Sequence, residues 1–233
     1  DDPAKGVRNL TYLSPEFLDA LQFAASKARE LGLRVDLTLG SGWPYGGPHI
    51  PLDQAAGRLR IEKTAGAPLK PGESVVAAFP DQGVTFIAGH TRMMVKRASV
   101  GAEGFVLDHY NRAALDNHLK AVAEPLLKAL GPNPPFAVFC DSLEVFGSDW
   151  ATDLLPEFQR RRGYDLKPEL PALLGEPDAR KGAIRNDWAQ TLAELAEERF
   201  LLPAQQWAHQ HGTQFRAQTY GTPPVTLSSQ RFV

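Results

Sequence analysis

The residues best suited to chemistry are the acids of the stretch CDSLEVFGSDW, which begins at Cys140. Asp141, Glu144 and Asp149 follow the apolar run at 135–139, so a buried strand is expected to deliver them to the surface. Hydrolysis of a glycosidic bond requires a proton donor for the departing oxygen and a second carboxylate as base or nucleophile. A half-desolvated glutamate beside another acid has its pKa raised toward the working pH. Asp141 and Glu144 are therefore candidate catalytic residues.

The same acids also suit a purely structural role. Asp141 is a residue type that commonly forms turns, and Glu144 would then be a surface acid. Ser148 or Asp149 would cap the helix that follows. A D-x-x-E pattern is common, so its spacing alone leaves both interpretations open.

A glycine- and proline-rich loop, GSGWPYGGPH at 40–49, follows a second predicted strand. Its glycines allow sharp backbone turns that present Trp43, Tyr45 and His49 at one end of the fold. An aromatic ring with a polar edge matches the C–H faces and hydroxyls of a sugar. These three residues are candidate sugar ligands, although such a loop also forms when its tryptophan simply packs beneath a neighbouring segment.

Two further strand ends carry polar side chains. Asp108 and His109 follow the apolar run at 105–107. They suit either the binding of hydroxyls or a metal, or the capping of a helix that starts near position 111. Gln218 and Tyr220 end a later strand-like run, TQFRAQT, and are candidate hydroxyl ligands.

The composition is that of a globular chain and predicts no nucleic-acid partner. Its 233 residues have a mean hydropathy of -0.27, and 25 Lys and Arg against 27 Asp and Glu give a net charge of -2. No basic block is long enough to follow a phosphate backbone. A single cysteine excludes an internal disulfide and a cysteine-based zinc site. No apolar window predicts a membrane span or signal peptide, and the start at Asp1 without methionine favours a processed form or an excised piece.

Helices and strands alternate along most of the chain, which is the layout of a (β/α) barrel. Periodicity and end signals predict helices at 14–31, 111–130, 152–162 and about 186–211, the last kinked by Pro203. Strands are expected at 33–39, 135–139 and 213–219. We therefore expect an α/β fold with a partial or complete (β/α)8 TIM-type barrel, whose chemistry lies on the loops after the strands.

A small β-rich insertion is expected at 57–103, where short strand-like runs alternate with proline and glycine. The runs lie at 58–62, 74–79, 84–88 and 91–95. The barrel segment would then comprise 1–56 and 104–233. A full barrel has eight strands and about 250 residues, so this barrel is expected to be incomplete after residue 233.

Five segments, LTYLSPEF, LGSGWPYGGP, DSLEVFGSDW, FQRRRGYD and FRAQTYG, occur in this order between about Leu10 and Tyr220. In these segments the chain resembles the bacterial α-L-rhamnosidases of glycoside hydrolase family 106, and the GSGWP and DSxE motifs are the most specific part. The resemblance implies a (β/α)8 catalytic barrel with appended β domains, inversion at the anomeric carbon and a calcium ion near the sugar. It also favours a periplasmic or secreted protein.

Carried onto this chain, the resemblance makes Glu144 the expected general acid, with Asp141 orienting it or holding metal. Glu144 and Asp141 are equally the expected calcium ligands, since calcium prefers several oxygen ligands. The expected substrates are terminal α-L-rhamnosides of plant or bacterial glycans. The rhamnose subsite would be lined by Trp43, Tyr45, His49 and Trp150.

A second catalytic carboxylate is not apparent in the sequence. An inverting hydrolase needs two carboxylates about 6.5 to 9.5 Å apart, and no acid follows Glu198. We therefore expect a segment of a longer enzyme that is inactive without the remainder of the barrel. Two alternatives stay open: a carbohydrate-binding protein without turnover, and another glycosidase on the same kind of barrel.

Overall fold

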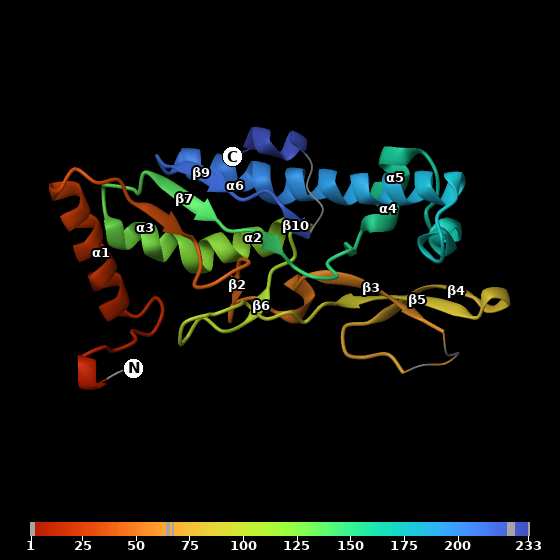
Figure 1. Cartoon of the computed structure of the whole chain (residues 1–233), viewed down its shortest axis with the longest axis horizontal. Helices are drawn as coiled ribbons and strands as arrows, with labels where there is room; N and C mark the ends of the chain where they lie inside the picture. The colour runs from red at the N-terminus through yellow and green to blue at the C-terminus, as the bar shows by residue number, and fades with distance from the viewer. Residues whose placement is uncertain (1–2, 64–65, 67, 223–226, 233) are drawn as a thin grey trace.

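The structure is a computed structural model that describes residues 3–63, 66, 68–222 and 227–232 as a mixed α/β fold (Figure 1). The helices are α1 (Pro15–Glu30), α2 (Arg112–His118), α3 (Glu124–Leu130), α4 (Leu154–Arg162), α5 (Ala179–Ala196) and α6 (Leu202–Gln210). The longer strands are β1 (Asp36–Thr38), β3 (Gly57–Glu62), β4 (Ser74–Phe79), β5 (Val84–His90), β7 (Ala137–Cys140) and β9 (Gln214–Ala217). Four strands have two residues each: β2 (Gly46–Gly47), β6 (Phe105–Val106), β8 (Leu143–Glu144) and β10 (Gly221–Thr222).

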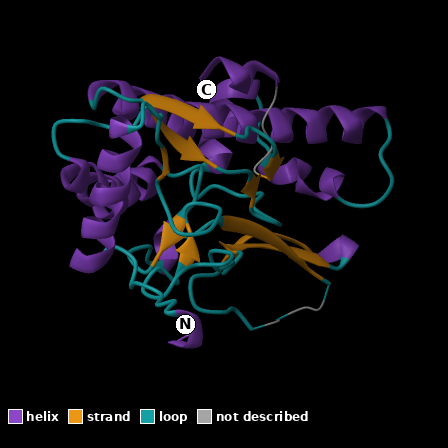
Figure 2. Ribbon diagram, turned by 60° about the vertical axis from the view of Figure 1, so that its left-hand side comes forward, coloured by secondary structure: helices purple, strands orange, loops and turns teal. Residues whose placement is uncertain are grey.

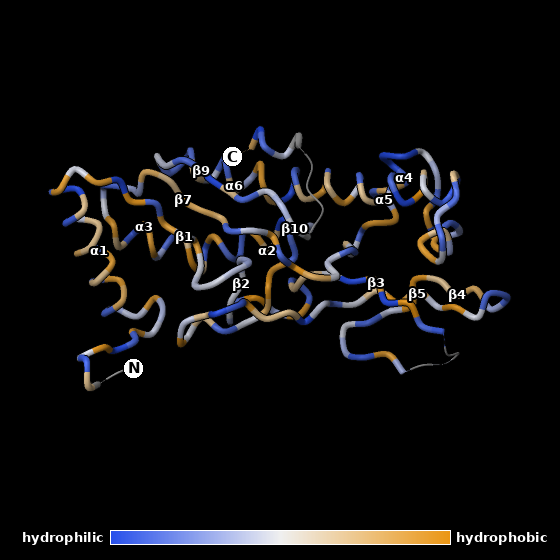
Figure 3. The backbone as a smooth tube through the Cα atoms, viewed as in Figure 1, coloured by the Kyte–Doolittle hydropathy of each residue, from blue (hydrophilic) through white to orange (hydrophobic). Residues whose placement is uncertain are grey.

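Three strands form a parallel sheet in the order β1-β7-β9. Leu37 on β1 pairs with Val138 on β7, which pairs in turn with Phe215 on β9. The central strand β7 is apolar along its length, as buried parallel strands are (Figure 3). β8 and β10 form a second, shorter parallel pair. The described residues contain no closed barrel, because β1 and β9 are each paired on one edge only there.

The first helix begins and ends where the sequence predicted. Ser14 accepts a hydrogen bond from the Phe17 amide at 3.2 Å, and Pro15 occupies the first helical position, where no donor is needed. Gly32 follows the helix with a φ of 72°, a left-handed conformation that glycine adopts without a steric penalty. Within α1 Ala25 alone is buried, so most of this helix remains in contact with solvent.

Two long helices each contain a π-helical turn just before a proline. Leu119–Ala123 connects α2 to α3 ahead of Pro125, and Glu197–Leu201 connects α5 to α6 ahead of Pro203. Proline lacks an amide donor, and its ring clashes with the carbonyl group four residues earlier in a regular helix. The wider π turn relieves both problems, so each helix continues through its proline. The irregularity predicted at Pro203 takes this form.

The β-rich segment forms an antiparallel sheet in the order β3-β5-β4, apart from the parallel strands (Figure 2). The runs predicted at 58–62, 74–79 and 84–88 are confirmed as strands. The run at 91–95 forms an isolated bridge of Met94 with Phe105 and no continuous strand. The division of the chain into a barrel segment and a separate β-rich insertion at 57–103 stays a prediction.

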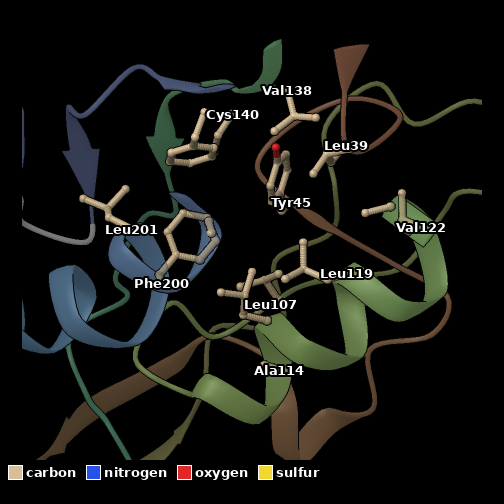
Figure 4. Packing of buried hydrophobic residues seen from close by; sticks show 14 of the residues in the cluster. Leu39, Tyr45, Leu107, Ala114, Leu119, Val122, Val138, Cys140, Phe200 and Leu201 are labelled. Atoms are coloured by element: carbon tan, nitrogen blue, oxygen red, sulfur yellow. The ribbon is translucent and has the colours of Figure 1, made fainter. Parts of the chain in front are cut away.

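The main hydrophobic core lies between the parallel sheet and the long helices. It combines side chains of β7, the two π-helical turns and the glycine-rich loop: Val138, Cys140, Leu119, Val122, Phe200, Leu201, Leu39 and Tyr45 (Figure 4). A second cluster around Phe86 and Phe158 joins the antiparallel sheet to α4 and α5. Among the described residues, none of the helices has the length and apolar character needed to span a bilayer.

Candidate active site

Glu144 stands at the end of β8 with its carboxylate partly open to solvent. Its side chain is 35% exposed, and parallel pairing with β10 holds its backbone. Its Oε2 atom accepts a hydrogen bond from Trp43 Nε1 at 2.7 Å and forms an ion pair with Lys96 Nζ at 3.2 Å. Three segments that are distant in sequence therefore meet at one carboxylate.

The loop that carries Trp43 is fixed by the segment that carries Lys96. The Trp43 amide donates to the Lys96 carbonyl at 3.2 Å, and the Lys96 amide donates to the Trp43 carbonyl at 2.8 Å. Gly42 has a φ of 88°, and a Cβ atom added to it would lie 2.0 Å from the Lys96 carbonyl oxygen. Glycine is thus required at this position by backbone conformation and by close approach. The loop does present an aromatic residue, and its ring nitrogen is directed at Glu144.

The partners of Glu144 hold its carboxylate in the charged form. The hydrogen bond from Trp43, followed by that from Lys96, lowers the pKa of Glu144. A general acid requires the opposite shift, because it must carry a proton at the working pH. In this structure the partners of Glu144 therefore favour its ionised form over the protonated form that a general acid needs.

The two other acids of this stretch bind backbone amides. Asp141 is half-buried, and its Oδ1 accepts a hydrogen bond from the Ser142 amide at 2.7 Å. Asp149 Oδ1 accepts a hydrogen bond from the Leu59 amide at 2.6 Å. Burial raises the pKa of Asp149 to about 6. Asp149 therefore anchors β3 through this hydrogen bond and does not stand free at the surface, where the sequence predicted it.

Two of the predicted sugar ligands are core residues in this structure. Tyr45 is 2% exposed and lies among the core residues (Figure 4). Its hydroxyl donates to the Phe139 carbonyl at 2.7 Å, and its ring stacks on His118 at 4.8 Å between centroids. Trp150 is 4% exposed and packs in the second core cluster. A buried ring has no free face for a sugar. Of the predicted aromatic ligands, the half-buried Trp43 is the one that contacts Glu144.

His49 belongs to a pair of hydrogen-bonded histidines. His118 Nε2 donates to the Leu39 carbonyl at 2.7 Å, so its Nδ1 is the acceptor for His49 Nε2 at 2.9 Å. Burial lowers the pKa of His49, and it lowers the pKa of His118 to about 3. Both rings are neutral hydrogen-bonding groups that hold the glycine-rich loop against α2.

Asp108 and His109 lie inside the protein. Asp108 Oδ1 accepts a hydrogen bond from the Tyr110 amide at 2.9 Å, and burial raises the pKa of Asp108 to about 7. His109 packs against Phe200 with 4.5 Å between ring centroids, and burial lowers its pKa to about 3. Helix α2 is capped by the side chain of Asn111. Asp108 thus forms the turn before the cap and is not the cap itself.

Gln218 and Tyr220 are exposed, and their segment is bonded to the backbone of β8. Tyr220 is 56% exposed, and its hydroxyl donates to Gln218 Oε1 at 3.0 Å. The Tyr220 carbonyl accepts a hydrogen bond at 3.1 Å from the amide of Leu143, the residue before Glu144. This accessibility suits hydroxyl ligands, and that role stays a prediction.

Lys96 and Phe146 are site residues that the sequence-based predictions did not include. Lys96 Nζ lies 5.7 Å from the centroid of the Trp43 ring and 4.9 Å from that of Phe146, so one cation contacts both rings and Glu144. Phe146 is 67% exposed. Its position two residues after Glu144 could have identified Phe146 as a candidate site residue from the sequence. No feature of the sequence around Lys96 indicates a carboxylate 48 residues away.

The described residues around Glu144 include no cluster of three or more acidic, histidine or cysteine side chains placed to hold a metal ion. The same holds elsewhere within residues 3–63, 66, 68–222 and 227–232. Glu144 Oε2 already faces an ammonium group and an N–H donor, which compete with a cation for the same oxygen. Calcium stays a prediction from the family resemblance.

Comparisons with known proteins point to a family of glycosidases. Residues 87–226, more than half of the chain, match glycoside hydrolase family 106, described as alpha-L-rhamnosidase. The matched residues include Lys96, Phe146 and Glu144.

Two individual proteins extend this likeness. The chain is 28% identical over 144 residues to a protein named putative beta-glucuronidase from Formosa agariphila, a match that covers 58% of this chain and 12% of that protein. The structure of a rhamnosidase from Novosphingobium sp. PP1Y shares the fold over 91% of this chain and 41% of its own, with a TM-score of 0.72 and 14% sequence identity. The chain thus spans less than half the length of either relative.

Proposed function

This chain belongs to glycoside hydrolase family 106, the alpha-L-rhamnosidases, and from that membership we propose that it contributes a catalytic site that removes terminal α-L-rhamnose from plant or bacterial glycans. The observation that carries the proposal is the environment of Glu144. Its carboxylate is partly open, held in the ionised form, and fixed by Trp43 Nε1 and Lys96 Nζ. Such a group is what the hydrolysis of a glycosidic bond requires.

The proposed mechanism is inverting and uses two carboxyl groups. Inversion requires a base that activates water and an acid that protonates the departing oxygen, about 6.5 to 9.5 Å apart. Because its partners hold Glu144 ionised, its proposed role is the base, and a second carboxyl group serves as the acid. This assignment reverses the role expected from the family resemblance, in which Glu144 is the proton donor.

Trp43 and Lys96 are positioning residues in this proposal. Both bind Glu144 Oε2, and Ser142 adds a further hydrogen bond to the carboxylate. We assign the proton of the attacking water to Oε1. The half-buried indole of Trp43 offers apolar surface to the methyl group and C–H faces of rhamnose. Calcium bound by Asp141 and Glu144 remains a proposed addition, and none of these steps requires it.

The proposal is tested with the protein that carries this chain, by measuring its turnover and the stereochemistry of its product. The substrates compared are para-nitrophenyl α-L-rhamnoside and para-nitrophenyl β-D-glucuronide, because one relative is named a putative beta-glucuronidase. Proton NMR of the first product should show β-L-rhamnose, the inverted anomer. Preference for the glucuronide would contradict the proposed substrate, and α-L-rhamnose as first product would contradict inversion. Rhamnose binding without turnover would instead indicate a carbohydrate-binding protein.

A further inference from the structure

A basic pocket lies on the antiparallel sheet, next to the loop that follows Glu144. It has a volume of about 110 Å³, and its cationic side chains are Arg58, Arg60, Lys70 and Arg92. Arg58 and Arg60 flank the buried Leu59 along β3. Because successive side chains alternate between the faces of a strand, both arginines project from the outer face of the sheet.

The positive charge of this pocket is only partly neutralised. Glu73 accepts hydrogen bonds from Arg60 Nε at 3.1 Å and Nη2 at 2.8 Å, and Arg60 Nη1 also pairs with Glu62. Arg58 acts on Asp149 through space, without an ion pair. In the part of the chain that the structure describes, three cations of the pocket have no carboxylate at ion-pair distance: Arg58, Lys70 and Arg92.

Arg58 connects this pocket to the Glu144 site. Gly147, the residue after Phe146, lies so close to Arg58 that an added Cβ atom would be 3.7 Å from its Nε. Phe146 is 67% exposed, and Lys96 Nζ lies 4.9 Å from its ring centroid. The exposed ring of Phe146 therefore has one cation, Lys96, near its face, and the next residue, Gly147, lies beside Arg58 of the basic pocket.

We propose that Phe146 and the basic pocket form a subsite for a sugar that carries an oxyanion, either the carboxylate of a uronic acid or a sulfate ester. This inference rests on the proposed function, since that sugar would neighbour the rhamnose at Glu144. The exposed ring packs against the C–H face of the sugar. Arg58 supplies a planar fork of donors that matches a carboxylate or a sulfate, and Lys70 and Arg92 add charge. The substrate class is an acidic, rhamnose-containing glycan.

Direct binding tests this subsite without turnover. The probes are methyl β-D-glucuronide, a sulfate ester of methyl β-D-glucoside, and neutral methyl β-D-glucoside, titrated into the protein and followed by ligand-observed NMR. At least one acidic probe should bind about tenfold more tightly than the neutral probe, because charge-assisted hydrogen bonds are stronger than neutral ones. The probe that binds identifies the oxyanion as carboxylate or sulfate. Equal affinity for all three probes would overturn the proposal.

Variants of the pocket locate the source of this preference. Arg58→Ala and Lys70→Ala, alone and combined, should reduce or abolish it, and Arg58→Lys should keep part of it because the charge remains. Arg112→Ala is the matched control, since Arg112 is an exposed arginine on α2 that pairs with Asp116. An acidic preference that survives the combined variant would contradict the pocket as its cause.

The outcomes also separate this subsite from the proposed function. If the protein hydrolyses α-L-rhamnosides but cleaves acidic and neutral glycans equally well, the function stands and the subsite fails. If acidic probes bind through Arg58 while no rhamnoside is hydrolysed, the anion site stands and the proposed function fails.

Discussion

Glu144 and the pair Asp108 and His109 have similar places in the sequence and opposite environments in the structure. Each follows an apolar run near a strand end, at β8 for Glu144 and after β6 for the pair. Glu144 keeps a 35% exposed side chain and gains an indole N–H and an ammonium group as partners. Asp108 is 4% exposed and His109 is fully buried. No described residue donates to or accepts from either His109 ring nitrogen.

The difference shows that a position after a strand does not by itself make a reactive site. For Asp108, burial outweighs the attraction of Arg199 and raises the pKa to about 7. For His109, burial lowers the pKa to about 3. At Glu144 the donors outweigh partial burial and lower the pKa. The decisive difference is the partial exposure of Glu144 together with the N–H donors that distant segments direct at it.

The Glu144 site and the buried region around Asp108 and His109 should differ most in their effect on turnover. Glu144→Gln keeps the size of the side chain but removes its ionisable group, so hydrolysis of an aryl α-L-rhamnoside should fall about 1,000-fold. Thermal unfolding should change little, because the side chain is partly exposed. Glu124→Gln, at an exposed position on α3, is the matched control. Activity of Glu144→Gln close to that of the parent would exclude Glu144 from the reaction.

In the buried region the largest effect should be on stability. Phe200→Ala removes a ring that is 1% exposed and packs on His109 and Tyr45, which should lower the free energy of unfolding by about 3 to 5 kcal/mol. The matched control, Phe23→Ala, removes a ring that is 72% exposed, and the change should stay below about 0.5 kcal/mol. Denaturant titrations followed by circular dichroism measure both. Similar losses in the two variants would contradict the assigned core.

The pH dependence of stability tests the neutral state of His109. Its pKa is lowered from 6.5 to about 3 by folding, so below pH 6.5 the unfolded chain takes up the proton first and stability is lost. His109→Leu removes this contribution. Between about pH 6.5 and 4.5 the variant should therefore lose about 2 kcal/mol less free energy of unfolding than the parent.

Two other buried groups, His118 and Asp108, are present in both parent and variant. His118 loses stability with acid in the same direction, because its pKa is also lowered to about 3. Asp108 acts in the opposite direction: its raised pKa of about 7 means that the folded protein binds a proton first as pH falls. The difference between parent and His109→Leu thus reports the loss of His109 together with its electrostatic effect on His118. Identical pH slopes would show that this ring is not buried as described.

A smaller effect should follow from removing the cation beside Glu144. Lys96→Met takes away one of the three donors, Trp43, Lys96 and Ser142, that lower the pKa of Glu144, so that pKa should rise. The acid limb of the profile of kcat/KM against pH should move to higher pH, with a several-fold loss of activity at acidic pH. Trp43→Phe should move the limb in the same direction. A profile that stays in place would separate Lys96 from the reactive carboxylate.

The sequence predicted those parts of the fold that depend on near neighbours. Ser14 and Gly32 mark the ends of α1 as expected. The start of α5 was placed too late, near 186, because its first turns lack an apolar stripe. Asp178 caps this helix by accepting a hydrogen bond from the Lys181 amide at 2.8 Å, and the helix therefore begins at Ala179.

The site depends on contacts that spacing does not encode. Trp43 and Glu144 were each predicted as site residues, but their hydrogen bond joins positions 101 residues apart. Tyr45 lies in the same loop as Trp43 and yet turns inward to the Phe139 carbonyl. Packing of the whole fold decides which aromatic residue of a glycine-rich loop stays accessible, so sequence patterns alone did not distinguish them.

The most direct test of Glu144 as the base compares two leaving groups in Glu144→Gln. Para-nitrophenyl and phenyl α-L-rhamnosides differ in how much the departing oxygen needs protonation, while both require an activated water. Loss of the base should reduce kcat/KM by a similar factor for both substrates, relative to the parent protein, and this is the predicted result. A variant that still cleaves the nitrophenyl substrate well but fails on the phenyl substrate would contradict this role and identify Glu144 as the general acid.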